Sequence, residues 1–354
     1  AGTAATANAG SYDISSSNAV FGTGSASNYD IHYNTLTDGL TVKARPITVT
    51  ADNLARLYGA SNPGLTWQMT SGNLVNGDKA SGGLTTLAAA SSDVGTYGIT
   101  QGTFGFGSNY ALTFVPGTLT VNPATLTVTA DTQSRIYGDS NPALTYGYSG
   151  FVNGDGAGLF SGALTTTADV TSNVGSYAIA KGTLSAGSNY LIDFTSASLA
   201  VTARPITVTA DNLARVYGAS NPVLGWQVTS GSLANGDTPS GALATSATAS
   251  SNVGAYGIAQ GTFGLGSNYA LTFVAGTLTV NPATLTITAD DDEKNTGQSI
   301  VLSGYRVNGL VSGDTVTGVM LASSGTDANA LVGSYAIVVS NATGSGLSNY
   351  DIHY

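Results

Sequence analysis

The sequence has 354 residues, with ten Lys and Arg against twenty Asp and Glu, so its formal net charge is -10 at pH 7. Because nucleic acids and anionic membrane surfaces are bound through clustered basic residues, this balance argues against both as direct partners. The chain contains no cysteine, which excludes disulfides, thiolate metal sites and a cysteine nucleophile. No apolar run is long enough to predict a membrane-spanning helix or direct membrane insertion.

Composition predicts a mostly β protein with more than one domain. Only 8% of the residues are charged and 42% are hydrophobic, while Thr, Ser, Asn and Gly supply most of the polarity. Val, Ile and Thr favour strands, and no segment predicts a long helix. A chain of this length is also longer than one that folds around a single typical hydrophobic core.

A repeat of about 80 residues organises the whole sequence. Five motifs recur in one order: SNY, a GTLTV strand that runs through NPA into TLT, YGxSNP, NGD and VGxY. SNY stands at 27–29, 108–110, 188–190, 267–269 and 348–350, and YGxSNP at 58–63, 137–142 and 217–222. NGD stands at 76–78, 153–155 and 235–237, and Ser312-Gly313-Asp314 is a variant of it. VGxY ends at Tyr97, Tyr177, Tyr256 and Tyr335. The joined strands lie at 117–131 and 276–290. Such self-similarity predicts a tandem array of small modules.

Joints that contain Pro divide this array. The expected modules are 44–122, 123–202, 203–281 and 282–354. Segment 1–43 is expected to be the C-terminal half of a module, because its SY pair at 11–12 matches the pair at 334–335. The module 282–354 is expected to be truncated before its closing strand. Since SNYDIHY occurs at both 27–33 and 348–354, we infer an excerpt of a longer array.

Within the module 44–122 the pattern predicts six strands. Residues 46–52 and 118–121 alternate Thr with apolar side chains, as half-buried strands do. Further strands are expected at 65–69, 84–87, 97–100 and 110–114. A turn at 115–117 is expected to join its two flanking strands into a hairpin. Asp78 is expected to cap one helical turn at 79–83.

The joints themselves are short. The strand at 118–121 is separated from the next TLT strand by only Asn122-Pro123-Ala124, and the other joints are of similar length. A short segment that contains Pro is stiffer than a Gly/Ser linker. The array is therefore expected to be a semi-rigid rod, roughly 120 to 160 Å long from domain-size scaling.

The set YGxSNPxLTY, vNGD, VGxYxI, SNYxLTFVxGTLTV and NPATLTVTAD closely resembles the MBG/YDG-type repeats of large exported bacterial adhesins. Those repeats occur in filamentous-haemagglutinin-like proteins of two-partner secretion. The resemblance implies small β-grasp-like modules and a parent protein that is a biofilm adhesin, anchored to the surface or released. The last module departs from the pattern, with DDDEKNTGQS at 290–299 in place of YGxSNP.

Two kinds of candidate binding residue stand out, each with an ordinary alternative. Trp67 and Trp226 occupy equivalent positions and could stack on sugars, or they pack in the core. The acidic run Asp290, Asp291, Asp292 and Glu293 offers oxygens to Ca²⁺, or it is a solvated loop. No cofactor is expected, apart from Ca²⁺ if this acidic run binds it.

The motif residues also have structural interpretations. The recurrent Tyr58 and Arg56 could form a binding strip, but packing at the core edge and an Arg bond to a carbonyl or carboxylate of the same module are favoured. The NGD triplets are expected to be turns.

Catalysis finds little support. His32 and His353 fall in equivalent SNYDIHY contexts, and no nucleophile elbow, zinc-binding or phosphate-binding motif is present. The four Lys residues, at 43, 79, 181 and 294, do not occupy one repeated position, which argues against a repeated Lys–Asn cross-link. The chain is therefore expected not to be an enzyme.

The sequence thus predicts a stalk or fibre segment of a secreted or cell-surface bacterial adhesin. Such a segment supports adhesion or biofilm cohesion by projecting a tip, and low charge permits association of fibres. Its expected partners are other copies of the fibre or further repeats of the same chain. The alternative is a carbohydrate-binding repeat module that contacts extracellular matrix polysaccharide.

Overall fold

The computed structural model describes residues 2–311 and 313–354 and is mostly β. The chain divides into two compact units: Ala1–Thr132, Ala143–Thr166 and Ala178–Ser198 form one, and Gln133–Pro142, Thr167–Tyr177 and Leu199–Tyr354 form the other. We call 1–43 the N-terminal segment and the four ranges after it the first, second, third and last module. No helix among the described residues is long and apolar enough to cross a membrane.

The first module, in the first unit, consists of two small sheets. The three-stranded sheet has the order β5-β3-β8, and the four-stranded sheet has the order β4-β9-β7-β6. The first sheet contains β3 (Arg45–Ala51), β5 (Trp67–Ser71) and β8 (Tyr110–Val115). The second contains β4 (Leu54–Leu57), β6 (Thr85–Thr86), β7 (Gly95–Thr100) and β9 (Gly117–Asn122). Strand β3 is antiparallel to β5 and parallel to β8, and β9 is parallel to β4 and antiparallel to β7.

Alternation of side chains builds the core of each sheet. Ile47, Val49 and Ala51 of β3 are buried, whereas the Thr residues between them are half-buried. Leu119 and Val121 of β9 are 0% and 1% exposed. Because successive strand residues point to opposite faces, this period of two lets short strands bury their apolar side. The predicted strands at 46–52 and 118–121 are confirmed.

Two strand pairs cross from one sheet to the other. After β3, the chain turns at Asp52 and enters β4, and after β8 it passes Pro116 and enters β9. Gly117 lies at the crossing, where an added Cβ would be 2.6 Å from the carbonyl oxygen of Ala51. Only glycine permits this close approach of the two backbones.

The structure corrects two local predictions for the first module. The turn at 115–117 does not make a hairpin, because β8 and β9 pair with different strands in different sheets. Residues 79–83 form no helical turn. The Asp78 carboxylate instead accepts a hydrogen bond from the Tyr110 hydroxyl at 2.8 Å. The strand predicted at 84–87 is limited to β6, and the one predicted at 65–69 begins at Trp67.

The N-terminal segment repeats one strand pair of a module. Strand β1 (Gly10–Ser15) is antiparallel to β2 (Thr35–Val42), with Gly10 opposite Val42 and Tyr12 opposite Leu40. In the first module, Gly95 lies opposite Val121 and Tyr97 opposite Leu119. The two pairs share this register at these positions, but the pairing of β1 with β2 then shifts, and Ile14 lies opposite Leu36. A 3-10 turn, η1 (Ala26–Asn28), lies between β1 and β2.

The second module repeats these elements, and the boundary between the units falls inside it. Its strands are β10 (Ala124–Ala130), β11 (Gln133–Ile136), β12 (Tyr146–Ser149), β13 (Thr165–Thr166), β14 (Gly175–Ala180), β15 (Tyr190–Thr195) and β16 (Ala197–Thr202), with η2 (Ala157–Leu159). The sheet β12-β10-β15 lies in the first unit. Strand β11 is parallel to β16 through residues of the second unit.

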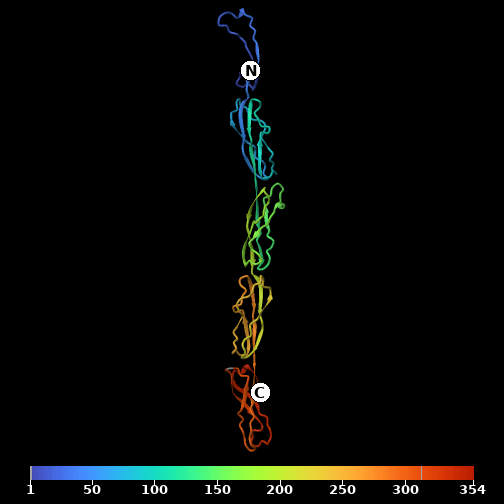
Figure 1. The fold of residues 1–354 in the computed structure, drawn as a ribbon, viewed down its shortest axis with the longest axis vertical. Coiled ribbons are helices and arrows are strands. Elements are labelled where there is room, and N and C mark those ends of the chain that lie inside the picture. The colour runs from blue at the N-terminus through green and yellow to red at the C-terminus, as the bar shows by residue number, and fades with distance from the viewer. Residues whose placement is uncertain (1, 312) are drawn as a thin grey trace. The chain divides into compact units, whose positions relative to one another are not determined.

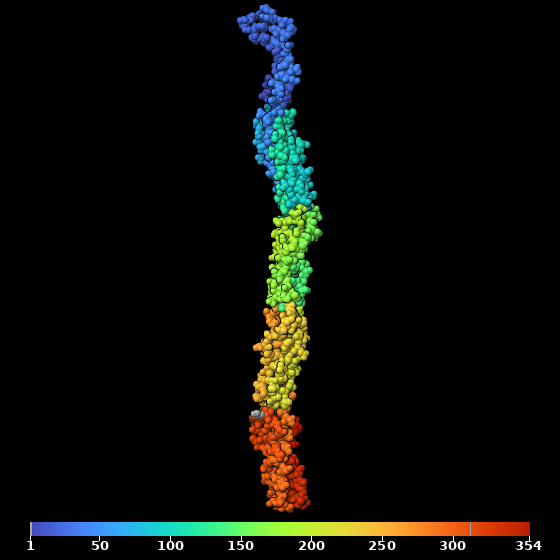
Figure 2. Space-filling view, in the orientation of Figure 1, coloured from blue at the N-terminus to red at the C-terminus, as the bar shows by residue number. Residues whose placement is uncertain are grey.

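The second unit also contains the third and last modules (yellow to red in Figure 1). The third module has the sheets β19-β17-β22 and β18-β23-β21-β20, in the order found in the first module. These strands are β17 (Arg204–Ala210), β18 (Leu213–Val216), β19 (Trp226–Ser230), β20 (Ala244–Thr245), β21 (Gly254–Ala259), β22 (Tyr269–Val274) and β23 (Gly276–Asn281). Figure 2 shows no deep hollow on the visible face of this module.

The last module keeps the three-stranded sheet but not the four-stranded one. Its sheet is β25-β24-β28, and a separate hairpin pairs β26 with β27. These strands are β24 (Ala283–Ala289), β25 (Tyr305–Asn308), β26 (Thr315–Ala322), β27 (Val338–Ser345) and β28 (Tyr350–His353), with η3 (Leu347–Asn349) before β28. The prediction of tandem, mostly β sheet modules is confirmed, and the β-grasp likeness stays a prediction.

Candidate functional site

The recurrent motifs gather at the joints between modules. Between the first and second modules, through residues of the first unit, Tyr58 and Tyr190 donate hydroxyl hydrogen bonds to Asp155 Oδ2 at 3.1 and 2.7 Å. The two rings pack edge to face, with centroids 5.6 Å apart. Tyr58 comes from YGxSNP of the first module, whereas Asp155 and Tyr190 come from NGD and SNY of the second. We call this arrangement the Tyr–Asp–Tyr cluster.

Equivalent residues meet twice in the second unit. Tyr269 donates to Asp237 Oδ2 at 2.8 Å beside Tyr137, and Tyr350 donates to Asp314 Oδ2 at 2.6 Å beside Tyr217. The ring pairs are T-shaped, with centroids 5.7 and 5.6 Å apart. The variant triplet 312–314 contributes Asp314 in the place of Asp155; its first residue, Ser312, lies outside the described residues.

Burial raises the pKa of four of these phenols. Burial, together with the hydrogen bond and charge of Asp155, raises the pKa of Tyr190 to about 12. Burial and Asp314 raise the pKa of Tyr350 to about 12 in the same way, and burial raises the pKa of Tyr217 and Tyr269. Each of these hydroxyls is therefore a hydrogen-bond donor to its carboxylate throughout the neutral pH range.

The glycine of YGxSNP is required by the joint. Gly59 has φ +81°, and a Cβ there would lie 2.4 Å from Cγ2 of Val152 in the second module. Gly138 and Gly218 repeat both properties, with Ala234 and Val311 as the neighbours across the joint. An L-residue at Gly59 would suffer both backbone strain and a steric clash.

The asparagine of SNY makes a second contact at each joint. Asn189 Oδ1 accepts the Val94 N–H at 2.9 Å, and its Nδ2 donates to Asp93 Oδ1 at 2.7 Å. The equivalent pairs of bonds are made by Asn109, Asn268 and Asn349. The partners belong to the VGxY region of the preceding module, or to Asn8 and Ala9 of the N-terminal segment.

The NGD triplets are turns, as predicted. The Asp155 N–H bonds the Val152 carbonyl at 3.0 Å, and Asn153 has φ +57°, which Asn tolerates better than most residues. The turn also contributes to the joint, because Asn153 Nδ2 donates to the Ala90 carbonyl at 3.3 Å. Asn235 repeats that contact with Val170 at 3.2 Å.

Arg56 holds the loop that presents Tyr58. It is only 7% exposed, and its guanidinium donates to Asn62 Oδ1 at 2.7 Å and to the carbonyls of Leu57 and Ala89. Arg135 and Arg215 make the equivalent bonds. The prediction that these Arg residues bond carbonyls of their own module is confirmed. Tyr58 is buried as expected, but its bond to the next module was not predicted.

The two Trp residues pack inside their own modules. The Trp67 ring lies 4.9 Å from the Phe104 ring and 5.7 Å from the Phe106 ring, and Trp226 lies 5.1 Å from Phe263. Both Trp side chains are half-buried. Core packing accounts for these positions, and sugar stacking at Trp67 and Trp226 stays a prediction.

The acidic run in the last module does not converge. Asp290 Oδ1 lies 2.7 Å from Arg306 Nε, while Asp291, Asp292 and Glu293 are exposed. Within residues 2–311 and 313–354, no three His, Cys, Asp or Glu side chains are grouped so that they could hold a metal ion. Binding of Ca²⁺ by Asp290, Asp291, Asp292 and Glu293 stays a prediction.

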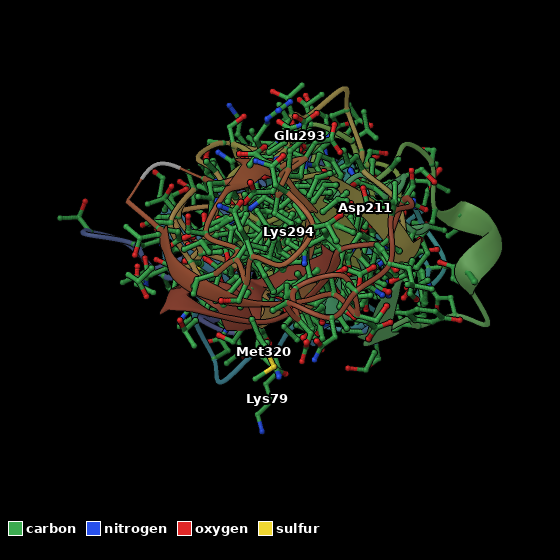
Figure 3. All side chains as sticks on the ribbon, turned by 90° about the horizontal axis from the view of Figure 1, so that it is seen from below. Lys79, Asp211, Glu293, Lys294 and Met320 are labelled. Carbon is green, nitrogen blue, oxygen red and sulfur yellow. The ribbon has the colours of Figure 1, made fainter. Side chains whose placement is uncertain are left out.

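The basic side chains and the histidines have separate roles. Lys294 follows Asp290 by four positions, as Arg56 follows Asp52. Like the Arg56 guanidinium, the Lys294 Nζ donates to backbone carbonyls, and its bond to the Asp327 carbonyl is 2.6 Å long. Lys79, by contrast, projects outward (Figure 3). His32 lies 3.2 Å from Asp30, and His353 lies 3.3 Å from its own SNYDIHY aspartate, in equivalent exposed pairs.

These features define a mostly β protein of tandem modules joined by one recurrent set of contacts. The family model of the MBG domain (YGX type) matches residues 47–120, 126–200, 206–279 and 285–354. The chain belongs to this family and carries four tandem copies of the domain. No curated protein matches the sequence. The Tyr-Gly pair of the YGX motif supplies both the phenol and the glycine of the joint described above.

Proposed function

We propose that this chain is a structural stalk or fibre segment of a large exported bacterial adhesin. The observation that carries the proposal is the joint, because an equivalent tyrosine ring pair and an equivalent SNY asparagine connect the first to the second, the second to the third and the third to the last module. A repeat that served only as a flexible spacer would not need buried aromatic pairs and side-chain bonds at every joint.

The joint supports stiffness through several independent contacts. The chain passes from β9 to β10 across Pro123 alone, and the Tyr58 N–H bonds the Asn122 carbonyl at 2.8 Å. The Tyr–Asp–Tyr cluster and Asn189 connect the same two modules elsewhere in sequence. Several contact points restrict bending and rotation more than a single covalent linker does.

We expect the chain outside the cell or on the bacterial surface, where such repeats would project a tip and support adhesion or biofilm cohesion. Its partners would be other copies of the fibre or further repeats, and a charged fraction of 8% favours lateral association. We assign no catalytic role, since the recurrent polar side chains are used in joint contacts.

Small-angle scattering of the whole chain tests the stalk. A stiff array predicts an elongated particle, roughly 120 to 160 Å in its longest dimension by domain-size scaling. A variant with Asp155→Ala and Asn189→Ala should scatter as a more flexible chain, because it loses two contacts of one joint. A compact particle for the unaltered chain would contradict the proposal.

Glycan binding separates the alternative function from the stalk. Part of each indole of Trp67 and Trp226 remains accessible, so a matrix polysaccharide could contact these rings. A glycan array with the whole chain should show binding that is lost on Trp67→Ala with Trp226→Ala if the repeats are carbohydrate-binding modules. The stalk proposal expects no such binding.

A further inference from the structure

The joint between the second and third modules contains an ion pair. Arg204 of the third module donates through Nη2 to Asp139 Oδ1 of the second module, and through Nε to the Tyr137 carbonyl at 2.7 Å. The side chains of Arg204 and Asp139 are 19% and 50% exposed. All three residues belong to the second unit. A half-buried guanidinium is thus held across the joint by a carboxylate and a carbonyl together.

The other two joints that follow a YGxSNP motif carry alanine at both positions of this pair. Asp139 is the third residue of its motif, and Arg204 is the strand residue opposite the SNY tyrosine. The equivalent pairs are Ala60 with Ala124, between the first and second modules, and Ala219 with Ala283, between the third and last modules. Arg45 has the strand position of Arg204 in the first module, but it follows no YGxSNP motif and donates to Asn73 of its own module at 3.2 Å. We call the joint with Asp139 the charged joint and the other two the alanine joints.

The residue before NGD changes together with the pair. In the alanine joints, a Cβ added to the YGxSNP glycine would have three side-chain atoms of Val152 or of Val311 as its nearest neighbours. In the charged joint its nearest neighbours are the Ala234 Cβ and then Arg204 Nη2 and Nε, at 3.4 and 3.5 Å. The guanidinium therefore contacts the glycine of the charged joint where only valine carbons do so in the alanine joints. Alanine at 234 leaves the room that the guanidinium takes.

We propose that Asp139, Arg204 and Ala234 act as one set that determines which module can follow which. A module that ends in YGDSNP accepts a module with Arg at the first-strand position and Ala before NGD. A module that ends in YGASNP accepts one with Ala and Val at these positions. The proposal rests on the proposed function in one respect, because it takes further repeats of the array as the partners.

Selection follows because mixed joints are unfavourable. Valine in place of Ala234 would overlap the space of the guanidinium, and an overpacked interface is destabilised. Alanine in place of Asp139 would leave a half-buried Arg204 without its carboxylate, which costs more than the pair itself contributes. Discrimination between partners depends on such unfavourable wrong combinations as well as on the favourable right one.

Hydrogen exchange at two equivalent amides measures the joints separately. The Val174 N–H bonds Asn268 Oδ1 at 3.0 Å across the charged joint, and the Val94 N–H bonds Asn189 Oδ1 at 2.9 Å across an alanine joint. In the whole chain, Asp139→Ala should speed exchange at Val174 about tenfold and leave Val94 unchanged, because a half-buried guanidinium loses its carboxylate. Unchanged exchange at Val174 would overturn the role of the ion pair.

Transfer of the set to the joint between the first and second modules tests selection itself. Ala124→Arg alone places a cation beside Ala60 and Val152, so exchange at Val94 should become at least about tenfold faster. The triple variant Ala60→Asp, Ala124→Arg and Val152→Ala should return that rate to within about threefold of the unaltered chain, because the three residues compensate one another. A triple variant that exchanges as fast as Ala124→Arg would overturn the proposal.

Amides inside the modules are the folding control. Those of β3 and β10 pair within one module, so their slow exchange shows that both modules are folded in each variant. If Ala124→Arg unfolds a module, recovery of slow exchange in the triple variant still supports the set, and failure to recover overturns it. Scattering of the unaltered chain tests the stalk separately: a compact particle refutes the stalk, whereas a triple variant without recovery refutes only the selection of modules.

Discussion

A single glycine allows the first and second modules to approach each other closely. At Gly59 the backbone is left-handed, and the next module lies within van der Waals contact. Any side chain at this position would therefore meet both backbone strain and a steric clash. The neighbouring Tyr58 then reaches Asp155 across the same interface. Gly59 and Tyr58, which are adjacent in the YGxSNP motif, thus contribute to the same interface.

Gly59→Ala should destabilise the joint more than strain alone explains. Left-handed strain costs about 1–2 kcal/mol, and contact with Val152 adds about 1–3 kcal/mol of overpacking. Gly77→Ala is the matched control, because Gly77 has φ +73° but a Cβ added there would meet no atom within 4 Å. Chemical denaturation of both variants measures the difference, and equal losses would contradict a role of Gly59 in the joint.

The Tyr–Asp–Tyr cluster should make stability depend on alkaline pH. The folded state holds the Tyr190 proton more tightly, with a pKa of about 12 against an ordinary value of 10.0. Its contribution is therefore complete below pH 10 and is lost as pH rises through about 12. Thermal unfolding against pH should show this decline, and Tyr190→Phe should flatten it. An unchanged slope in Tyr190→Phe would exclude Tyr190 as its source.

At the scale of elements, one buried Arg organises the loop between β4 and β5. Arg56 donates to Asn62 and to the carbonyls of Leu57 and Ala89, and Asn62 in turn donates to the Ala88 carbonyl at 2.6 Å. This network replaces regular secondary structure in a loop without strand pairing of its own. It is the support on which Tyr58 is presented to the next module.

Removal of that Arg should destabilise the first module strongly. Arg56→Ala removes the bonds of a buried guanidinium to Asn62 and to the carbonyls of Leu57 and Ala89, and it should cost about 2–4 kcal/mol. Arg56→Lys should cost less, because Lys294 makes comparable bonds to carbonyls in the last module. Denaturant unfolding of the two variants measures their free energies of unfolding. If Arg56→Lys were no more stable than Arg56→Ala, Lys could not replace Arg in this network.

At the scale of the whole molecule, the joints couple the stability of neighbouring modules. In arrays of this kind the total stability is a sum of module terms and nearest-neighbour interface terms. Each joint here is an interface term that consists of the Tyr–Asp–Tyr cluster, the SNY asparagine and the YG glycine. Modules that share such a joint should unfold together.

Asp155→Ala should separate the unfolding of the first and second modules. It removes the carboxylate that accepts from both Tyr58 and Tyr190, so the interface term falls while both cores remain intact. Calorimetry should show a broader or divided transition. Asp78→Ala is the control, because Asp78 bonds Tyr110 within its own module. Equal broadening in both variants would show that the carboxylate stabilises a module and not the joint.

Much of this architecture was determined by the sequence alone. The repeat of about 80 residues predicted the tandem modules, the Thr-alternating segments predicted β3 and β9, and the NGD triplets predicted turns. These are local properties: a period of two and a turn residue act within a few positions of the chain.

Only the tertiary structure decided where the motifs meet. The bond between Asn189 and Val94 joins residues 95 apart, which is longer than the repeat itself, so one period gives no sign of it. The crossing of β8 into β9 between two sheets, which replaced the predicted hairpin, is likewise set by pairing with distant strands. A strand's partners depend on which edges lie nearby, and the pentapeptide GSYAI is strand at 175–179 in β14 but not at 333–337.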